Sequence, residues 1–424
     1  RPDTTKIKAG DDASGTDAIS SGEMTIAADV ENTASITGLT AGTSYDVWVT
    51  AEDGNSNITT ASKKDVTTLA LPKKLTVKQD GSGDYPTISA AISAASSTTA
   101  DTVVVYAGTY QENVNFGGKN LVVRSNTGAE NTIIIPSNNG LAVVWFYSGE
   151  PSTAKLVGFT LKDGGALQGS ALNIETNSSP TIEDCIITNS KGYPVRFYNS
   201  ASAIKNTLIY SNVGDGVFYF DNYTTTTYPE IINCTVANNS GYGIQNAKSY
   251  KPIIKNSIFY GNSSGGAFGN LDITYSIVEG TYTGTGNKSS DPIFVSSTNF
   301  NITDYSPAIG AGSSTDAPTS DLAGSRRGAP PDMGAYENSL STPLADTDIP
   351  MVSYVREGLT DDVAYVGSDT KIPAHWKGSD AASGIKKYEL AVDTSATTIA
   401  GSIKGWTSVG TDTSTTIEGL SLVE

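Results

Sequence analysis

Residues 181–262 contain one short phrase four times: TIEDCIITNS (181–190), AIKNTLIYSN (203–212), EIINCTVANN (230–239) and IIKNSIFYGN (253–262). Aligned on their fifth position, the copies are anchored at Cys185, Thr207, Cys234 and Ser257, which lie 22, 27 and 23 residues apart. This period is too short for a helix pair or a propeller blade and is typical of one turn of a β-solenoid. The repeat therefore predicts a stack of short parallel rungs.

Two columns of the aligned repeat are apolar and predict one wall of a core. Three positions before the anchor stand Ile182, Ile204, Ile231 and Ile254, and two positions after it stand Ile187, Ile209, Val236 and Phe259. The position immediately before the anchor holds Asp184, Asn206, Asn233 or Asn256. Asp and Asn tolerate a left-handed backbone better than other residues with a side chain, so each rung is expected to turn a corner there, on a stacked Asn ladder.

A second strand is predicted in every rung, because a Gly-rich loop after each anchor strand leads into YPVRFYN, DGVFYFD, YGIQNA or GAFGN. Cys185 and Cys234 occupy the same column of rungs that are not adjacent. Since parallel rungs are about 4.8 Å apart, two rungs separate the sulfurs too far for a disulfide. We expect two free, buried cysteines that fill small core sites.

Composition supports a large, strand-rich and acidic protein. The 424 residues predict two or three domains, and 43 Gly with only 17% charged residues favours strands and turns over helices. A net charge of −17 argues against nucleic acid as a partner, because the chain has no basic stripe to neutralise phosphates. No run of 18 apolar residues is present, so no membrane-spanning helix is predicted.

Residues 1–70 and 345–424 predict two incomplete sandwiches. In the first, Leu39 and Gly42 precede an alternating strand that starts at Tyr45. This pattern resembles the end of a fibronectin type III domain, with Tyr45 as its tyrosine corner. The second resembles the first strands of such an Ig-like sandwich, with Trp376 in its core. We expect either a portion of a longer multidomain chain or a filament in which one copy's tail completes the next copy's head.

Between these flanks, residues 73–338 form the predicted solenoid. Its entrance, LTVKQDGSGDYPTISAAISAA followed by DTVVVYAGTYQENV, resembles the opening of pectinesterase- and pectate-lyase-like right-handed parallel β-helices. In that resemblance the segment Thr87 to Ala95 is a short helix that plugs the first rung. The fold class we predict is therefore all-β, a right-handed parallel β-helix between two partial sandwiches.

The exit of the solenoid has a motif of its own. The stretch SPAIGAGSSTDAPTSDLAGSRRGAPPDMGAYE resembles the terminal motif of bacterial choice-of-anchor Q β-helix proteins, which are secreted or attached to the cell surface. The resemblance implies structural cap positions at Pro307, Asp332, Gly334 and Tyr336. It also implies an extracellular or cell-surface location, and it supports the fold better than any activity.

Catalytic motifs are scarce in the predicted solenoid. The GNADFIFG and LGRPW stretches of pectinesterases have no counterpart, and the only histidine, His375, lies outside the solenoid. This excludes histidine-based acid–base chemistry and Ser-His nucleophiles there. A polysaccharide lyase needs only an Arg or Lys base and an acidic calcium cluster. Its candidates are Lys191 and Arg196, with Glu175 and Asp221 on neighbouring rungs.

The strand after each Gly-rich loop offers a glycan-binding surface. Alternation predicts that Val195, Phe197, Val217 and Tyr219 point inward. Outward-pointing aromatic, charged and amide side chains suit a groove that stacks sugars and binds their hydroxyls. The candidate ligand-binding residues are Glu175, Arg196, Tyr198, Phe218, Phe220 and Gln245. The alternative is that these aromatics cover one another beneath the loop 223–229.

Calcium is the one ion for which the sequence offers ligands. Asp346 and Asp348 precede the second sandwich, and oxygen ligands fit an acidic chain, although a solvated linker is the simpler explanation of these residues. The function we predict is a non-catalytic extracellular or cell-surface module, a glycan binder, spacer or adhesin. The alternatives are a polysaccharide lyase and a filament subunit that self-associates through its terminal half-domains.

Overall fold

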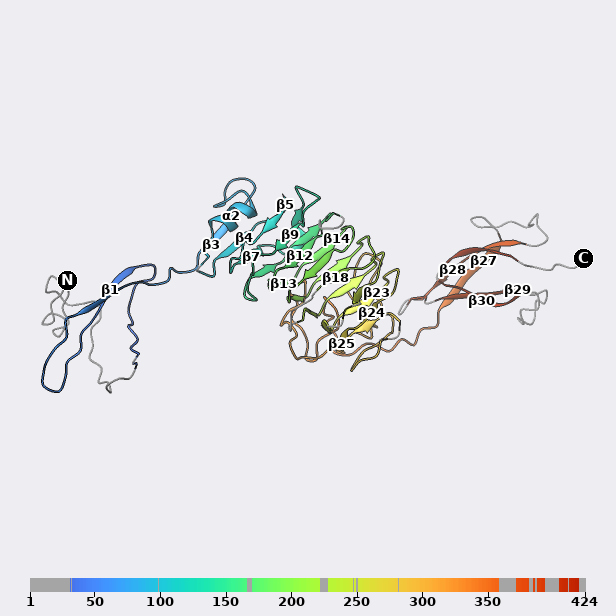
Figure 1. Cartoon of the computed structure of the whole chain (residues 1–424). Helices are drawn as coiled ribbons and strands as arrows, with labels where there is room; N and C mark the ends of the chain where they lie inside the picture. The colour runs from blue at the N-terminus through green and yellow to red at the C-terminus, as the bar shows by residue number, and fades with distance from the viewer. Residues whose placement is uncertain are drawn as a thin grey trace, which may run out of the picture. The chain divides into compact units, whose positions relative to one another are not determined.

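The structure is a computed structural model of the 424-residue chain (Figure 1). It describes residues 31, 33–97, 99–165, 170–221, 228–246, 248, 251–280, 282–357, 371–380, 384–385, 387–392, 404–410 and 412–418. Two compact units are present, Arg1–Ala203 with Phe220–Pro229, and Ile204–Tyr219 with Glu230–Glu424.

In the first unit the short strands pair in parallel with strands one rung away, in three sheets. The first sheet runs in the order β3 (Lys74–Val77), β4 (Thr102–Val105), β7 (Val122–Ser125), β10 (Lys155–Val157) and β13 (Thr181–Glu183). The second contains β5 (Gly108–Gln111), β8 (Thr132–Ile135, after the 3-10 turn η1, Ala129–Asn131), β11 (Thr160–Lys162) and β14 (Ile186–Thr188). The third contains β6 (Val114–Asn115), β9 (Val144–Phe146), β12 (Leu172–Glu175) and β15 (Val195–Tyr198).

The second unit repeats this arrangement. Its first-sheet strands are β16 (Ala203–Lys205), β19 (Glu230–Ile232), β22 (Ile253–Lys255) and β25 (Asp272–Thr274). Its second-sheet strands are β17 (Leu208–Tyr210), β20 (Thr235–Ala237), β23 (Ile258–Tyr260) and β26 (Ile277–Val278). The parallel pair β21 (Ile244–Asn246) and β24 (Ala267–Gly269) completes its rungs. The strand β18 (Phe218–Asp221) belongs to the third sheet, where it is the neighbour of β15.

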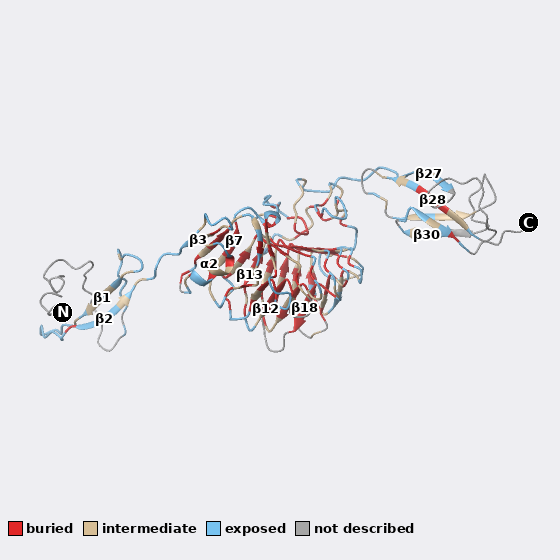
Figure 2. Cartoon of the chain, turned by 90° about the horizontal axis from the view of Figure 1, so that it is seen from above, coloured by how far each residue is buried: buried red, intermediate tan, exposed pale blue. Residues whose placement is uncertain are grey.

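The predicted apolar columns form the core of the solenoid. All eight side chains of the two columns, from Ile182 to Phe259, have no exposed surface. Figure 2 shows this buried interior along the strands of the solenoid. The corner prediction is also confirmed, since φ lies between 46° and 54° at Asp184, Asn206, Asn233 and Asn256. The all-β, right-handed parallel β-helix that the sequence predicted is therefore the observed fold.

A second asparagine ladder, which the sequence analysis did not predict, runs inside the second unit. The Nδ2 of Asn212 donates to Oδ1 of Asn239 at 2.9 Å, and the Nδ2 of Asn239 donates to Oδ1 of Asn262 at 2.9 Å. All three residues are at most 4% exposed. Stacked carboxamides thus satisfy one another and the turns of three successive rungs.

The predicted entrance helix is present as α2 (Ile88–Ala94). Its side chains Ile88, Ala91 and Ile92 are buried, and Thr87 caps its first turn by accepting a bond from the Ala90 N–H. Glu112 accepts two further bonds from the first turn, from the backbone N–H groups of Ile88 at 2.9 Å and Ser89 at 2.8 Å. The helix is thereby tied to the solenoid that follows it.

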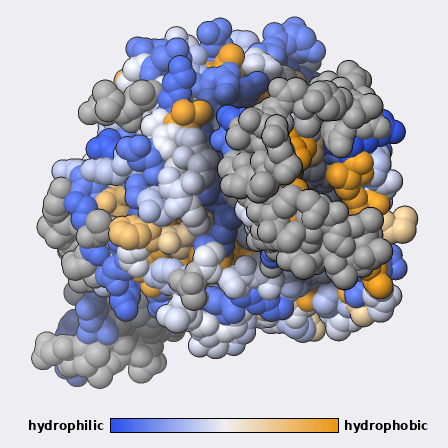
Figure 3. Space-filling view, turned by 90° about the vertical axis from the view of Figure 1, so that its right-hand side faces the viewer, coloured by the Kyte–Doolittle hydropathy of each residue, from blue (hydrophilic) through white to orange (hydrophobic). Residues whose placement is uncertain are grey.

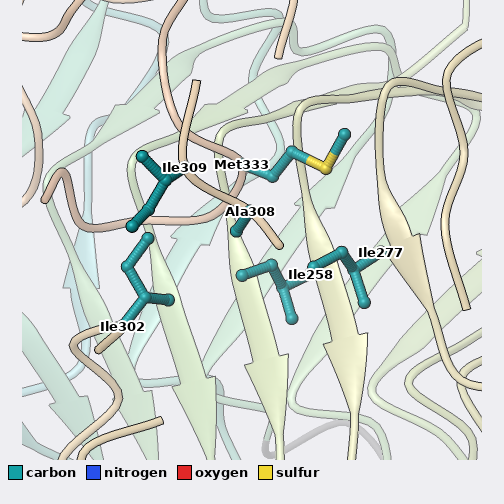
Figure 4. Close-up of a cluster of buried hydrophobic side chains, with 6 residues drawn as sticks. All are labelled: Ile258, Ile277, Ile302, Ala308, Ile309 and Met333. Carbon is teal, nitrogen blue, oxygen red and sulfur yellow. The ribbon is translucent and has the colours of Figure 1, made fainter. Parts of the chain in front are cut away.

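After β26 the chain folds back within the second unit, and its described residues form no further strand before β27. We call residues 304–340 the strap. Its Ala308, Ile309 and Met333 pack with Ile302 on the outward side chains Ile258 and Ile277 of β23 and β26 (Figure 4). The corner asparagines hold it, because Asn206 donates to the Ser320 carbonyl at 2.7 Å and Asn233 to the Asp332 carbonyl at 3.0 Å.

A buried polar network fastens the strap to itself. Arg327 donates to Glu337 at 2.9 Å, and their side chains are only 2% and 6% exposed. The carboxylate of Asp332 accepts backbone bonds from Gly310 and Asn338, both at 2.6 Å. Burial raises the pKa of Asp332 to about 6. Asp332 and Gly334, which the exit motif implied as cap positions, thus lie in the strap.

Antiparallel sheets lie toward both ends of the chain. The strands β1 (Ser44–Val49) and β2 (Ser62–Thr67) pair with each other, and the hydroxyl of Tyr45 accepts a bond from the Thr40 N–H at 2.7 Å. Toward the other end, one sheet contains β27 (Met351–Glu357), β28 (Ile372–Ser379) and β31 (Ser414–Ile417), and another contains β29 (Tyr388–Val392) and β30 (Lys404–Gly410). The assignment of these sheets to fibronectin-like domains stays a prediction.

The face shown in Figure 3 is mainly hydrophilic, with separate apolar patches on it. Trp376, predicted as a core residue, is 7% exposed and packs with Ala374 and Ile417. Within the described part of the chain, no helix is long and apolar enough to cross a membrane.

Candidate functional site

The third sheet of the first unit presents one column of polar and aromatic side chains away from the core. Asn115 is the register partner of Trp145, Trp145 of Asn173, and Asn173 of Arg196. The residues on either side of these positions, such as Val195 and Phe197, are fully buried. Successive rungs therefore place one member of this column about 4.8 Å from the next.

A second outward column lies two residues further along the same strands. Glu175 on β12 is the register partner of Tyr198 on β15, and Tyr147 follows β9 with 40% of its surface exposed. The rings of Trp145 and Tyr147 are 4.7 Å apart between centroids. We call the two columns together the β9–β15 face. It consists of Trp145, Tyr147, Asn173, Glu175, Arg196 and Tyr198.

The carboxylate of Glu175 is the fixed point of this face. Its Oε1 accepts a bond from Nη1 of Arg196 and one from Nδ2 of Asn173, each at 2.9 Å. Its Oε2 accepts no hydrogen bond from any described residue. The guanidinium of Arg196 also lies 5.6 Å from the centre of the Tyr198 ring. A half-open carboxylate is thus held beside aromatic rings.

Unused hydrogen-bonding capacity lies in the first outward column. The indole N–H of Trp145 and the Oδ1 of Asn173 are buried and have no hydrogen-bond partner in the described parts of the chain. These two side chains are register partners on neighbouring strands. Buried polar atoms without partners cost about 1–3 kcal/mol each, and such sites are often functional. The orphaned donor and acceptor are a second reason to consider this face functional.

The prediction that Phe218 and Phe220 point outward was wrong. Their side chains are 0% and 4% exposed, and the ring of Phe220 stacks on that of Phe197 at 5.3 Å. The loop from the anchor to this strand is one residue longer than in the preceding rung, since Phe218 is eleven residues after Thr207 while Val195 is ten after Cys185. A shift of one residue exchanges the two faces of a strand, so Tyr219, predicted inward, is the half-exposed residue.

The structure brings together three of the six predicted ligand-binding residues, Glu175, Arg196 and Tyr198. Gln245 is half-exposed on β21 in the second unit. Sequence reasoning missed Trp145 and Tyr147, because β9 precedes the four copies of the repeat. It also missed Phe268, although a signal was present: Arg196, Gln245 and Phe268 are each eleven residues after their anchors. Of the loop 223–229, only Tyr228 and Pro229 are among the described residues.

The lyase candidates are arranged differently from the prediction. Arg196 is paired with Glu175, and a guanidinium does not lose its proton in proteins. Lys191 is exposed in the turn before β15, where its backbone N–H donates to the Gly164 carbonyl at 2.9 Å. Asp221 is 8% exposed on β18. The face therefore offers a held ion pair rather than a free base.

The remaining predictions concern calcium and cysteine. Asp346 and Asp348 are exposed, and the Asp346 carboxylate accepts a bond from the Asp348 N–H at 3.0 Å. Calcium takes six to eight oxygen ligands, and the described residues hold no group of three or more acidic, His or Cys side chains suited to a metal.

Cys185 and Cys234 are free and buried, as predicted, and desolvation raises the pKa of each to about 12.

A protein-family comparison supports the fold. Residues 113–303 match the family model described as a right handed beta helix region. A solved structure, pectin methylesterase from carrot, is similar over 53% of this chain and 84% of its own, with 17% sequence identity and a TM-score of 0.35. No curated protein sequence matches the chain. At this identity and TM-score, the enzyme's activity does not transfer to the present chain.

Proposed function

We propose that the protein is a non-catalytic, extracellular or cell-surface β-helix that binds a glycan chain on the β9–β15 face. The observation that carries the proposal is the Glu175 carboxylate, fixed through one oxygen by Arg196 and Asn173 and open at the other. The ring of Tyr198, the register partner of Glu175, and the paired rings of Trp145 and Tyr147 belong to the same face. Sugars need this combination, because their C–H faces stack on aromatic rings while their hydroxyls donate to fixed acceptors.

Electrostatics favours a neutral glycan over a polyuronate. The only cation of the face is Arg196, and Glu175 neutralises it at 2.9 Å. The whole chain carries a net charge of −17, which repels an acidic polymer at a distance. A neutral polysaccharide meets neither obstacle, and its hydroxyls can donate to the Glu175 carboxylate.

Two resemblances in the sequence support the proposed location. The stretch 306–337 resembles the terminal motif of secreted and surface-attached β-helix proteins, and the flanking segments resemble fibronectin type III domains. Rigid β-helices with sandwich modules on either side suit adhesins and spacers that present a binding face away from the cell. The proposed partner is therefore a polysaccharide or a cell-surface glycan.

Substitution of Tyr198 tests the proposal. Binding of neutral hexasaccharides of glucose, mannose and xylose, and of an oligogalacturonate, is measured by calorimetry. We expect Tyr198→Ala to weaken binding of a neutral hexasaccharide about tenfold, since a stacked ring contributes up to about 1.5 kcal/mol. Glu175→Gln is expected to weaken it further, because the carboxylate is the strongest acceptor of the face.

The control is Tyr106→Ala. Tyr106 is half-buried beneath the Lys78 ammonium, 4.5 Å from its ring centre, and so resembles Tyr198 beneath Arg196, but it lies outside the face. Equal loss in both variants, or no binding of any neutral probe by the wild type, would rule the proposal out. Unsaturated products released from oligogalacturonate would instead identify a polysaccharide lyase.

Self-association through the terminal sheets is a second candidate function. Among the described strands, β1 and β2 form a two-stranded sheet, and such a hairpin is only marginally stable by itself. Strand β27 lies at the edge of its sheet and exposes 67% of Met351, 59% of Val352 and 68% of Val355. Strand addition from a second copy would cover such an edge.

A further inference from the structure

The second unit carries a pair of aromatic side chains that the proposed site does not use. The rings of Tyr242 and Phe268 are stacked, with centroids 5.4 Å apart and planes inclined by 29°. Phe268 has 55% of its surface exposed, although it belongs to the regular strand β24. A ring held on a rigid strand and open to solvent offers a flat apolar face at little conformational cost.

Gln245 adds a free carboxamide beside these rings. It is the register partner of Phe268 on the neighbouring strand and is half-exposed. Its Nε2 lies over Gly216, where a Cβ would approach it to 2.9 Å, so this glycine leaves room for the amide. No described residue makes a hydrogen bond to the Gln245 side chain. Both a donor and an acceptor are thus open to a ligand.

The chain beyond Phe268 is held rigidly. The Nδ2 of Asn246, a residue only 2% exposed, donates to the Asn270 carbonyl at 2.7 Å, and the Asn270 N–H donates back to the Asn246 carbonyl at 2.9 Å. The Tyr282 hydroxyl donates to the Gly269 carbonyl at 3.0 Å. These bonds fix the backbone that supports the Phe268 ring.

A polar groove of about 600 Å³ begins at the residue after Phe268. Its lining includes Gly269, Lys251, Asp272 and Thr285. Lys251 and Asp272 are exposed, and neither forms an ion pair with another described residue. The groove is in the size range of small-ligand sites, and it offers hydroxyl, ammonium and carboxylate groups next to an apolar platform.

We propose that Tyr242, Gln245 and Phe268 form a second carbohydrate-binding site, which opens into this groove. A pyranose ring stacks its C–H face on Phe268, its hydroxyls bond to the Gln245 carboxamide, and the next sugar enters the groove. The inference takes its ligand class from the proposed function, but it shares no residue with the β9–β15 face. With both sites, one molecule binds a long glycan at two points.

The alternative explanation is that Phe268 merely packs on Tyr242. It predicts that removal of the ring changes stability and leaves carbohydrate binding unchanged. The two explanations are separated by calorimetry with the full chain and the neutral hexasaccharides named above. We expect Phe268→Ala and Gln245→Ala each to weaken one class of binding site about tenfold. Val295→Ala, at a side chain of the same unit that is 53% exposed, is the matched control and should bind as the wild type does.

The outcomes separate this inference from the proposed function. Loss of one class of site in Phe268→Ala and of the other in Tyr198→Ala supports both. Loss only in Tyr198→Ala leaves the first proposal standing and refutes the second site. Loss of binding only in Phe268→Ala supports the second site and refutes the proposed function of the β9–β15 face. Wild-type affinity in Phe268→Ala, or an equal loss in Val295→Ala, overturns the inference, and thermal unfolding of each variant verifies that it is folded.

Discussion

The residues that turn the solenoid's corners have a second task in the second unit. A left-handed corner needs a short polar side chain, and Asn206, Asn233 and Asn256 provide it. Their carboxamides also hold the strap, because each donates to a strap carbonyl, for Asn256 that of Ser313 at 2.8 Å. One residue type thus sets the backbone turn and binds the segment that covers it.

At the same scale, Asp332 makes the strap sensitive to pH. Burial raises its pKa from the usual value near 4 to about 6, so the folded protein favours the protonated carboxyl. Its contribution to stability is therefore fully present below about pH 4 and is lost as the pH rises through about 6. We expect the wild type to lose on the order of 2 kcal/mol from this group between pH 4 and 7.5, measured by denaturant unfolding.

Asp332→Asn is the variant that isolates this effect. An asparagine keeps one acceptor oxygen for the Gly310 or Asn338 N–H group but does not titrate. The difference in unfolding free energy between wild type and variant should change steadily between about pH 4 and pH 6 and level off above that. A difference that stays constant from pH 4 to 7.5 would show that Asp332 does not titrate in this range.

At the scale of the element, a rung is stabilised by bonds to its neighbours more than by its own three-residue strands. Asn239 shows this most clearly, since its Oδ1 accepts two bonds from Asn212 and its Nδ2 donates to Asn262 and to the carbonyls of Ile209 and Ala237. It therefore joins three rungs. Solenoids gain their stability from such interfaces between adjacent repeats.

We predict that Asn239→Ala lowers the free energy of unfolding by about 3 kcal/mol, because it leaves several buried polar atoms without a partner. The measurement is denaturant unfolding followed by circular dichroism. Asn299→Ala is the control, since Asn299 is exposed and its side chain bonds, among the described residues, only to the nearby Asn301. Surface substitutions usually change the free energy of unfolding by less than about 0.5 kcal/mol. A loss of this size in both variants would contradict a structural role for the ladder.

At the scale of the whole molecule, self-association is the property to measure. If strand addition joins copies, the particle mass rises above 44.0 kDa with concentration in ultracentrifugation, and chains appear by electron microscopy. Val355→Lys should shift the protein toward single copies, because a charge on an edge strand opposes pairing. Val213→Lys, at another side chain that is 60% exposed, should not. If the particle mass of the wild type stays at 44.0 kDa at every concentration, the filament hypothesis is ruled out.

The amino-acid sequence by itself determined the rung. Each repeat contributes one isoleucine to the core column and one Asn or Asp to the corner. Both features are local, so a periodic sequence pattern shows them directly. The free, buried cysteines followed from the same column count. Half of the candidate site, Glu175, Arg196 and Tyr198, also followed, because these residues alternate with buried ones along regular strands.

Only the tertiary structure decided the faces of β18 and the course of the strap. One extra residue in a Gly-rich loop turned Phe218 and Phe220 inward, and loop length shows in the sequence only after the register is known. In the strap, Arg327 donates a hydrogen bond to Asn206, which lies 121 residues earlier in the sequence. No local sequence pattern encodes such a contact. Periodicity specifies what repeats, whereas the segments that cover a solenoid are placed by long-range packing that occurs once.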